Sequence, residues 1–248
     1  MVDTQPEALN LTERLLAIGT ALSAEKDTPR LLEQILLGAK EITQADGGTL
    51  YTVGDDGRSL QFAILRTDSL QIAMGGTTGK PITFPNLPLY DAEGQPNTNM
   101  VAACAALERK TINIPDAYEE TRYDFSGTRK FDANTGYRSK SFLTVPLENH
   151  EGEVIGVLQL LNKIDENSGE VVPFSAADQR LVESLASQAA VSLTNQQLIK
   201  SLQELFESFI EMIATAIDDK SPYTGGHCRR VPEISMMLAD ACARTEVG

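Results

Sequence analysis

The sequence predicts an α+β fold in which helices flank one antiparallel sheet. Apolar residues recur at helical spacing up to about Ala45 and again from Ser175, whereas short β-prone runs occupy the region between them. Turn sequences separate these runs, as in antiparallel hairpins. Two helices, a meander of strands with helical interruptions and a long final helix together are typical of an α+β domain.

The composition disfavours several classes of partner. The 248 residues carry a formal net charge of −14, which argues against nucleic acid or an anionic membrane surface as a partner. No apolar run reaches the ~20 residues of a membrane span. The three cysteines, Cys104, Cys228 and Cys242, are interpreted as free thiols, so we expect a cytoplasmic protein.

Two helices are predicted at the beginning of the chain. Residues 1–10 are polar and are expected to be flexible, and the spacing of Asn10 and Glu13 is that of a capping box, which predicts a helix beginning after Asn10. An apolar stripe then follows at Leu11, Leu15, Ile18 and Leu22. A second helix is predicted from Thr28 to about Ala45, because Pro29 suits a first helical turn.

The middle of the chain is predicted to form the sheet. Residues 49–53 and 60–65 flank an Asp-Gly turn, which indicates a hairpin. Further strands are expected at 111–114, 141–147 and 154–162, and a helix at 98–110. The segment 75–97 is rich in Gly, Pro, Thr and Asn and is too long for a plain connection, so we expect an ordered, functional loop.

A long helix is predicted after Ser175, because Ser175 and Asp178 form a second capping box and no Pro or Gly follows until Pro222. Such a helix has about 45 residues and a length of about 65 Å. Its distal half carries a heptad seam of Leu198, Leu202, Leu205, Phe209, Met212 and Ala216, with Asn195 one seam position upstream. The seam indicates a homodimer. The alternative is packing on a neighbouring helix of the same chain, which is disfavoured because little chain surrounds the stripe.

Three stretches resemble GAF domains, the small-molecule sensor modules of signalling proteins. The first is TINIPDAY at 111–118, and the second is FDANTGYRSKSFLTVPL at 131–147 with the GEVIGVLQLLNK that follows. The third lies between residues 162 and 178. The resemblance covers residues 11–200 and implies a GAF fold for them.

The third stretch is similar to the NKFDE signature of GAF domains that bind cyclic nucleotides. It consists of Asn162, Lys163, Phe174 and Asp178, while Gln179 stands where the signature has Glu. Lys163 ends a predicted strand and Asp178 lies in the first turn of the final helix, so we expect an ion pair that ties this helix to the sheet. The alternative is two solvated charges.

The resemblance implies a ligand pocket between the sheet and the segments that precede TGYRS. It places Tyr118, Asp132, Thr135 and Ser139 around the ligand. Thr135 and Ser139 are four residues apart, so both hydroxyls would face one way on a short helix. Phe125 or Tyr123 could stack on a base. For each of these residues the alternative is a structural role, as a cap, a surface carboxylate or a core aromatic.

Two other GAF chemistries are disfavoured by the cysteine content. GAF domains that attach a bilin use a pocket Cys, usually beside a His, and GAF-type methionine sulfoxide reductases need several Cys. Cys104 has no His close to it in sequence and is the one cysteine within residues 11–200. We therefore interpret Cys104 as a small buried apolar residue and His150 as an exposed residue of a turn.

Residues 221–248 resemble the start of an HD-GYP domain, a family of hydrolases that cleave cyclic di-GMP. His227 matches the first metal-binding histidine, and Arg230-Val231 match the residues after it. The complete domain implies Fe or Mn held by further ligands, including a His-Asp pair and a Gly-Tyr-Pro region, which this sequence lacks. We therefore expect the chain to stop inside that domain, to hold no metal at His227 and no other cofactor, and to be inactive.

Together the resemblances imply a regulatory module of a cyclic di-GMP phosphodiesterase. The GAF pocket would bind a small molecule, for example a cyclic nucleotide, in a homodimer. Residues 201–220 would form a signalling helix that passes the ligand state to the hydrolase. The alternative is a ligand-free dimerisation or interaction module.

Overall fold

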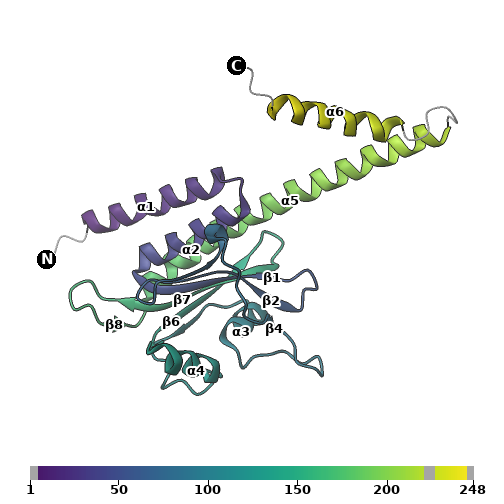
Figure 1. Cartoon of the computed structure of the whole chain (residues 1–248). Coiled ribbons are helices and arrows are strands. Elements are labelled where there is room, and N and C mark those ends of the chain that lie inside the picture. Colours follow the sequence, from purple (N-terminus) through teal and green to yellow (C-terminus); the bar gives the residue numbers. More distant parts are fainter. Residues whose placement is uncertain (1–4, 221–226, 245–248) are drawn as a thin grey trace. The chain divides into compact units, whose positions relative to one another are not determined.

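The computed structural model describes residues 5–220 and 227–244 (Figure 1). These form two units, one of residues up to Gln196 and one of residues from Gln197 onward. The first unit holds the sheet and every helix that packs on it. The described residues of the second unit are helical.

One antiparallel sheet organises the first unit, which confirms the predicted fold class. The strand order is β3-β2-β1-β7-β6-β5, with β4 paired to β2 and β8 paired to β7. The strands are β1 (Ala45–Val53), β2 (Ser59–Thr67), β3 (Ile72–Gly75), β4 (Leu87–Pro88), β5 (Ile112–Ile114), β6 (Phe142–Glu148), β7 (Val154–Ile164) and β8 (Val171–Val172). The long strand β7 therefore lies between β1 and β6, in the middle of the sheet.

Helix α2 (Thr28–Thr43) and the first part of α5 (Ala176–Lys220) cover one face of the sheet, and α1 (Gln5–Ala24) packs on α2 (Figure 1). Their contact with the sheet is the main core, which includes Leu36 of α2, Leu158 and Leu160 of β7, and Leu185 of α5. All four of these side chains are fully buried. Since Leu158 and Leu160 are two residues apart, they point to the same face of the strand.

The opposite face carries α3 (Val101–Glu108), α4 (Ser126–Thr135) and the loop of residues 79–97, which follows the short 3-10 helix η1 (Gly76–Thr78) (Figure 1). Val157, Gln159 and Leu161 of β7 alternate with the core leucines, so they point to this second face. Here two smaller apolar clusters form under α3, and between them the face is not filled.

The first helix begins earlier than its sequence pattern predicts. Helix α1 starts at Gln5, so Asn10 lies within it and is not its N-cap, and residues 5–10 belong to a helix. Pro6 sits in the first turn, where proline is tolerated because its missing N–H has no partner inside the helix. The capping-box spacing at Asn10 and Glu13 was therefore coincidental. Helix α2, by contrast, begins at Thr28 as predicted, with the Asp27 carboxylate accepting from the Arg30 amide at 2.9 Å.

Helix α5 has the predicted start and length. It runs for 45 residues, and its capping box is present: the Asp178 amide donates to Ser175 Oγ at 3.2 Å and the Ser175 amide donates to Asp178 Oδ2 at 2.7 Å. The large apolar residues of the heptad seam are 51–66% exposed in this chain, namely Leu198, Leu202, Leu205, Phe209 and Met212. They are thus not buried by the described residues of the same chain.

Helix α6 (His227–Arg244) contains Pro232 and exposes Val231, Ile234, Met236, Met237 and Leu238. The side chains of His227 and Cys228 lie outside the part of the chain whose side chains are described. No described helix has the length and hydropathy that crossing a membrane requires. His150 is exposed in the turn between β6 and β7, as the sequence indicates.

Candidate ligand-binding site

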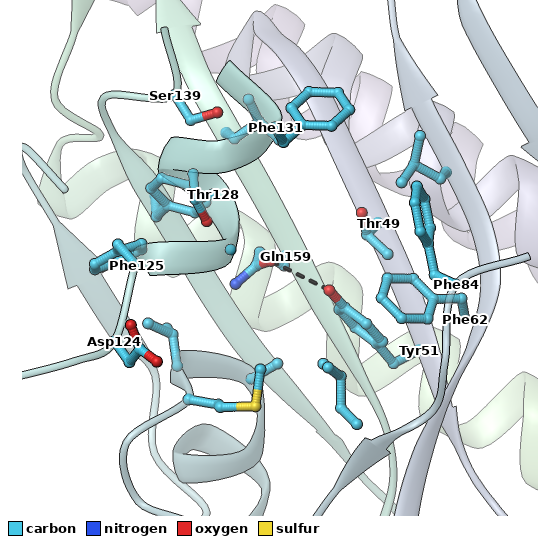
Figure 2. Close-up of a pocket in the computed structure, with 18 of the residues that line it drawn as sticks. Thr49, Tyr51, Phe62, Phe84, Asp124, Phe125, Thr128, Phe131, Ser139 and Gln159 are labelled. Atoms are coloured by element: carbon cyan, nitrogen blue, oxygen red, sulfur yellow. Dashed lines mark hydrogen bonds between the residues drawn. The ribbon is translucent and has the colours of Figure 1, made fainter. Parts of the chain in front are cut away.

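A cavity of about 350 Å³ lies between the sheet and the segments that cover its second face (Figure 2). Strands β1, β2, β6 and β7 form its floor, and α3, α4 and the loop 79–97 form its walls. Seven aromatic rings line it: Tyr51, Phe62, Phe84, Phe125, Phe131, Tyr137 and Phe142. This volume lies near the lower end of the ~300–1,000 Å³ typical of small-molecule sites, and the aromatic lining is also typical.

The loop 79–97 supplies one wall, in agreement with its predicted order. Phe84, Pro85 and Leu87 all line the cavity. The Phe84 ring lies 5.5 Å from the Phe62 ring, which in turn lies 4.8 Å from the Tyr51 ring. Three rings from a loop and two strands therefore form a continuous apolar surface that can receive a planar ligand.

Two helix N-termini open onto the cavity from the opposite wall. Val101 and Ala102 are the first residues of α3, and Gly127 and Thr128 belong to the first turn of α4; all four line the cavity. Neither helix has a side-chain hydrogen bond from its N-cap residue. Because the first amides of a helix lack partners within the helix and carry the positive end of its dipole, this wall favours a negatively charged group.

The Asp124 carboxylate opposes the binding of a negatively charged group at these helix N-termini. It is the one charged side chain among the described residues that line the cavity, and it accepts a hydrogen bond from the Ser126 amide at 2.8 Å. Hydrogen bonds from Ser126 hold the pKa of Asp124 below its usual value, so the carboxylate is charged at neutral pH. An anionic group of a ligand is therefore attracted by backbone amides and repelled by one carboxylate.

A row of polar side chains crosses the floor. Gln159 of β7 is paired in register with Thr49 of β1 on one side and Thr144 of β6 on the other. Gln159 Nε2 donates to Thr144 Oγ1 at 3.0 Å, and Gln159 Oε1 accepts from the Tyr51 hydroxyl at 3.4 Å (Figure 2). Burial raises the pKa of Tyr51, so its hydroxyl is a neutral hydrogen-bonding group. The floor therefore offers hydrogen bonds without a charge.

The hydroxyl of Tyr137, a further lining residue, is tied to the scaffold. The Tyr137 hydroxyl donates to Asp46 Oδ2 at 2.5 Å, and Asp46 also accepts from the amide and hydroxyl of Ser69. Burial, and then the Asp46 carboxylate, raise the pKa of Tyr137. This network anchors the Tyr137 ring against strand β1 and leaves its apolar faces to the cavity.

The structure brings three of the four predicted ligand-binding residues together, although they mostly contact each other. Asp132 is buried and accepts from the Tyr118 hydroxyl at 2.7 Å, the Ser139 amide at 2.8 Å and the Ser139 hydroxyl at 2.8 Å. The bond to Asp132 raises the pKa of Tyr118. Of the three, Ser139 alone lines the cavity. Tyr118 and Asp132 therefore position Ser139 and are not part of the cavity wall.

Thr135 lies apart from this cluster. Helix α4 ends at Thr135 because Gly136 adopts a left-handed conformation with φ of 70°, so Thr135 and Ser139 do not share a helical face as predicted. The exposed Thr135 hydroxyl donates to the carbonyl of Phe131 at 2.9 Å. Of the two predicted stacking residues, Phe125 lines the cavity, whereas Tyr123 packs in the cluster that contains Cys104.

Cys104 is fully buried, in agreement with its interpretation as an apolar residue. Burial is also the largest cause of the raised pKa of its thiol, which disfavours the reactive thiolate. Among the described residues, no group of three or more His, Cys, Asp or Glu side chains is arranged to hold a metal ion.

The end of strand β7 connects the cavity to helix α5. Lys163 Nζ lies 2.6 Å from both carboxylate oxygens of Asp178, with 21% and 8% of the two side chains exposed. The neighbouring Asn162 has a left-handed backbone with φ of 55° and a buried side chain. Its amide oxygen accepts from the Lys140 amide at 2.7 Å and its amide nitrogen donates to the Arg138 carbonyl at 2.8 Å. Asn162 thereby fixes the backbone on both sides of Ser139.

Comparison with protein families agrees with this geometry. The family model of the GAF domain matches residues 27–193, which is well over half of the chain. The chain belongs to the GAF domain family. GAF domains are regulatory domains of signalling proteins, and the matched residues include the sheet, the cavity and the first part of α5.

Curated relatives of this GAF protein include phosphodiesterases. It is 34% identical over 98 residues to a dual 3',5'-cyclic-AMP and -GMP phosphodiesterase 11A of Takifugu rubripes, a match that covers 40% of this chain and 10% of the relative. It is 27% identical over 186 residues to a cGMP-specific 3',5'-cyclic phosphodiesterase of Drosophila mojavensis, which covers 73% and 15%. The chain therefore spans a small part of the length of these relatives.

Solved structures show the same fold. The GAF domain of a phosphoenolpyruvate-protein phosphotransferase from Coxiella burnetii superposes with a TM-score of 0.57 at 17% identity, covering 78% of this chain and 98% of that one. A free methionine-R-sulfoxide reductase from Neisseria meningitidis gives a TM-score of 0.55 at 18% identity, covering 78% and 93%. At such identities the likeness concerns the fold alone.

The floor residues Thr49, Tyr51 and Gln159 were not recognised from the sequence. Their signal is the period-two alternation of β1 and β7, which places them on the face opposite the core leucines. The alternation of polar and apolar residues alone does not distinguish the polar floor of a cavity from a solvent-facing surface. That distinction depends on α3, α4 and the loop 79–97 covering the face.

Replacing Lys163 by Met should lower the free energy of unfolding, because it leaves the Asp178 carboxylate buried without its cation. Loss of one partner of a fully buried pair costs about 3–5 kcal/mol, and the partial exposure of Lys163 reduces the expected loss to about 2 kcal/mol. Urea unfolding measures it. In the control Lys200→Met, the lost pair with Glu204 is exposed and 3.9 Å long, so the expected change is below about 0.5 kcal/mol. Equal losses in the two variants would show that the ion pair does not brace α5.

Proposed function

We propose that this GAF unit is a cytoplasmic sensor that binds a cyclic nucleotide in the cavity on the second face of the sheet. The observation that carries the proposal is a cavity that combines aromatic rings, an uncharged polar floor and the N-termini of α3 and α4. A cyclic nucleotide offers a planar base for the rings and a singly charged cyclic phosphate for helix N-termini. No basic side chain lines the cavity among the described residues, so the phosphate would be held by backbone amides.

The cavity volume bears on the size of the ligand. About 350 Å³ suits a mononucleotide better than a cyclic dinucleotide, which is about twice as large. The relatives that match this chain are phosphodiesterases whose names specify cyclic AMP and cyclic GMP. GAF domains in general bind small molecules of this kind, and the resemblance to the NKFDE signature supports the same class. We therefore favour cyclic AMP or cyclic GMP over cyclic di-GMP as the ligand.

A homodimer formed by the distal part of α5 belongs to the same proposal. The second unit exposes a broad apolar face on residues 198–217, where ten large apolar side chains are 43–66% exposed. A helix with so much apolar surface is stabilised by packing against another helix, and the heptad spacing fits a second copy of the chain. This face is also the observation behind the second candidate, a dimerisation module without a ligand.

We further propose that the whole protein is a cyclic di-GMP phosphodiesterase of the HD-GYP type, regulated by the GAF unit through the α5 segment. The support is the sequence likeness around His227, Arg230 and Val231. The residues present do not fit a metal centre, since the sequence has no His-Asp pair and no Gly-Tyr-Pro motif. The activity is thus proposed for the whole protein and not for these 248 residues.

Replacing Phe84 by Ala should weaken cyclic nucleotide binding, because the ring forms part of the apolar wall and stacking on a base is worth about 1–3 kcal/mol. We expect the Kd for cyclic AMP or cyclic GMP to rise about tenfold in calorimetry. The control Leu37→Ala removes a similarly exposed apolar residue from α2 and should leave the Kd unchanged. If the unaltered chain binds neither nucleotide while forming a dimer, the second candidate is favoured.

The double substitution Leu202→Glu with Phe209→Glu should convert the dimer to a monomer, because it places carboxylates at two seam positions that a partner helix would bury. Light scattering coupled to gel filtration gives the mass directly. The matched control, Gln197→Glu with Gln203→Glu, adds the same two charges outside the seam and should remain dimeric. A dimer that survives the seam substitutions would place its interface elsewhere.

The chain of 248 residues should not hydrolyse cyclic di-GMP in the presence of Mn²⁺ or Fe²⁺, because one histidine cannot supply the ligands that metal-dependent hydrolysis needs. The protein encoded by the full reading frame should hydrolyse it, at a rate that responds to the bound cyclic nucleotide. Product chromatography measures both. Metal-dependent turnover by the chain itself would contradict the assignment, as would a full-length protein with no turnover.

A further inference from the structure

The floor of the cavity carries one carboxamide among the described lining residues, that of Gln159. Figure 2 shows it in the middle of the floor, between Thr49 on one side and Phe125 and Thr128 on the other. The aromatic rings lie around this group, so a planar ligand that enters between the rings presents an edge to it. Gln159 is thus placed to contact the edge of a base and not its face.

Part of the hydrogen-bonding capacity of Gln159 is committed to the protein. Its Nε2 donates one hydrogen to Thr144 Oγ1 at 3.0 Å, and its Oε1 accepts a long hydrogen bond of 3.4 Å from the Tyr51 hydroxyl. A carboxamide has two N–H donors and two acceptor lone pairs. One donor and one acceptor position therefore remain for a ligand, side by side on the same group.

The two protein partners of Gln159 do not fix which way the amide faces. Thr144 and Tyr51 both present hydroxyls, which donate or accept equally well, so a rotation of the amide by 180° keeps both bonds. Thr49 adds a third hydroxyl in register with Gln159. The floor is therefore able to offer its donor and its acceptor in either order.

We propose that Gln159 reads the hydrogen-bonding edge of a purine base, and that its amide accepts adenine and guanine alike. This inference rests on the proposed binding of a cyclic nucleotide. Adenine presents an amino donor beside a ring-nitrogen acceptor, which a glutamine amide pairs with in bidentate fashion. Guanine presents a carbonyl acceptor beside an N–H donor, and the amide pairs with it after the 180° rotation.

Gln159→Glu tests the assignment, because a carboxylate only accepts hydrogen bonds. It matches the adjacent N1–H and amino donors of guanine and has no donor for the ring nitrogen of adenine. The affinity ratio of cyclic GMP to cyclic AMP, measured by calorimetry, should rise about tenfold over the unaltered chain. The ratio cancels any general weakening that a new carboxylate causes for both anionic ligands.

Gln61→Glu is the matched control. Gln61 lies on strand β2, which β1 separates from β7, and its exposed side chain is outside the cavity lining, so the same chemical change should leave the affinity ratio unaltered. If Gln159→Glu lowers the melting temperature so far that the protein is unfolded, Gln159→Met replaces it. Met keeps the length of the side chain without its hydrogen bonds, and it should weaken both nucleotides about tenfold.

The outcomes separate the inference from the proposed function. If both variants bind cyclic nucleotides and the affinity ratio of cyclic GMP to cyclic AMP is the same in Gln159→Glu and Gln61→Glu, the proposed role of Gln159 is wrong. The proposed function is then unaffected. Undiminished binding by Gln159→Met overturns the proposed role of Gln159 in the same way. If the unaltered chain binds neither cyclic AMP nor cyclic GMP, the proposed function and the inference both fail.

Discussion

The end of strand β7 fixes two segments that arrive from distant parts of the chain. Asn162 turns out of the regular strand conformation and uses its side-chain amide to hold the backbone around Ser139, while Lys163 holds the first turn of α5 through Asp178. These are bonds of buried or half-buried groups, for which a missing partner is costly. Two adjacent residues therefore hold both the cavity rim and the first turn of α5. The residues that hold the rim and the first turn of α5 are thus joined by one peptide unit.

In the cavity, side chains determine the shape and backbone amides supply the positive electrostatic potential. Apart from the Asp124 carboxylate, its described lining side chains are uncharged, and the positive character comes from the amide ends of α3 and α4, whose position is fixed by packing. A lysine or arginine at the same place would bind an anion more strongly, but its flexible side chain would have to be ordered when the ligand binds. Backbone amides next to Asp124 give weaker attraction that is already oriented before a ligand binds.

The elements that the sequence predicts well are those with a long, uniform period. The strands at 141–147 and 154–162, the start of α2 and the 45 residues of α5 all follow from apolar spacing and from caps that the structure contains.

The wrong predictions rest on signals that depend on few residues. Asn10 has capping-box spacing but lies inside α1, and Gly136 separates Thr135 from Ser139 by ending α4 at Thr135. The Lys163–Asp178 pair follows from two predicted positions, the end of a strand and the first turn of a helix, together with the resemblance to the NKFDE signature. In the sequence, Gln159 and Thr49 are polar residues of alternating strands, which is also the pattern of a solvent-facing surface. They form a cavity floor because α3, α4 and the loop 79–97 cover that face of the sheet.

The wall formed by residues 79–97 differs from the rest of the cavity because few of its residues are hydrogen-bonded to the sheet as strands. Its regular pairing is limited to the two residues of β4 and one bridge between Tyr90 and Pro96, yet Phe84, Pro85 and Leu87 line the cavity. Insertions or substitutions there change the contour met by a ligand while leaving the main core intact. Ligand preference can therefore change through substitutions in this one surface connection, while the packed layer that holds the fold together stays the same.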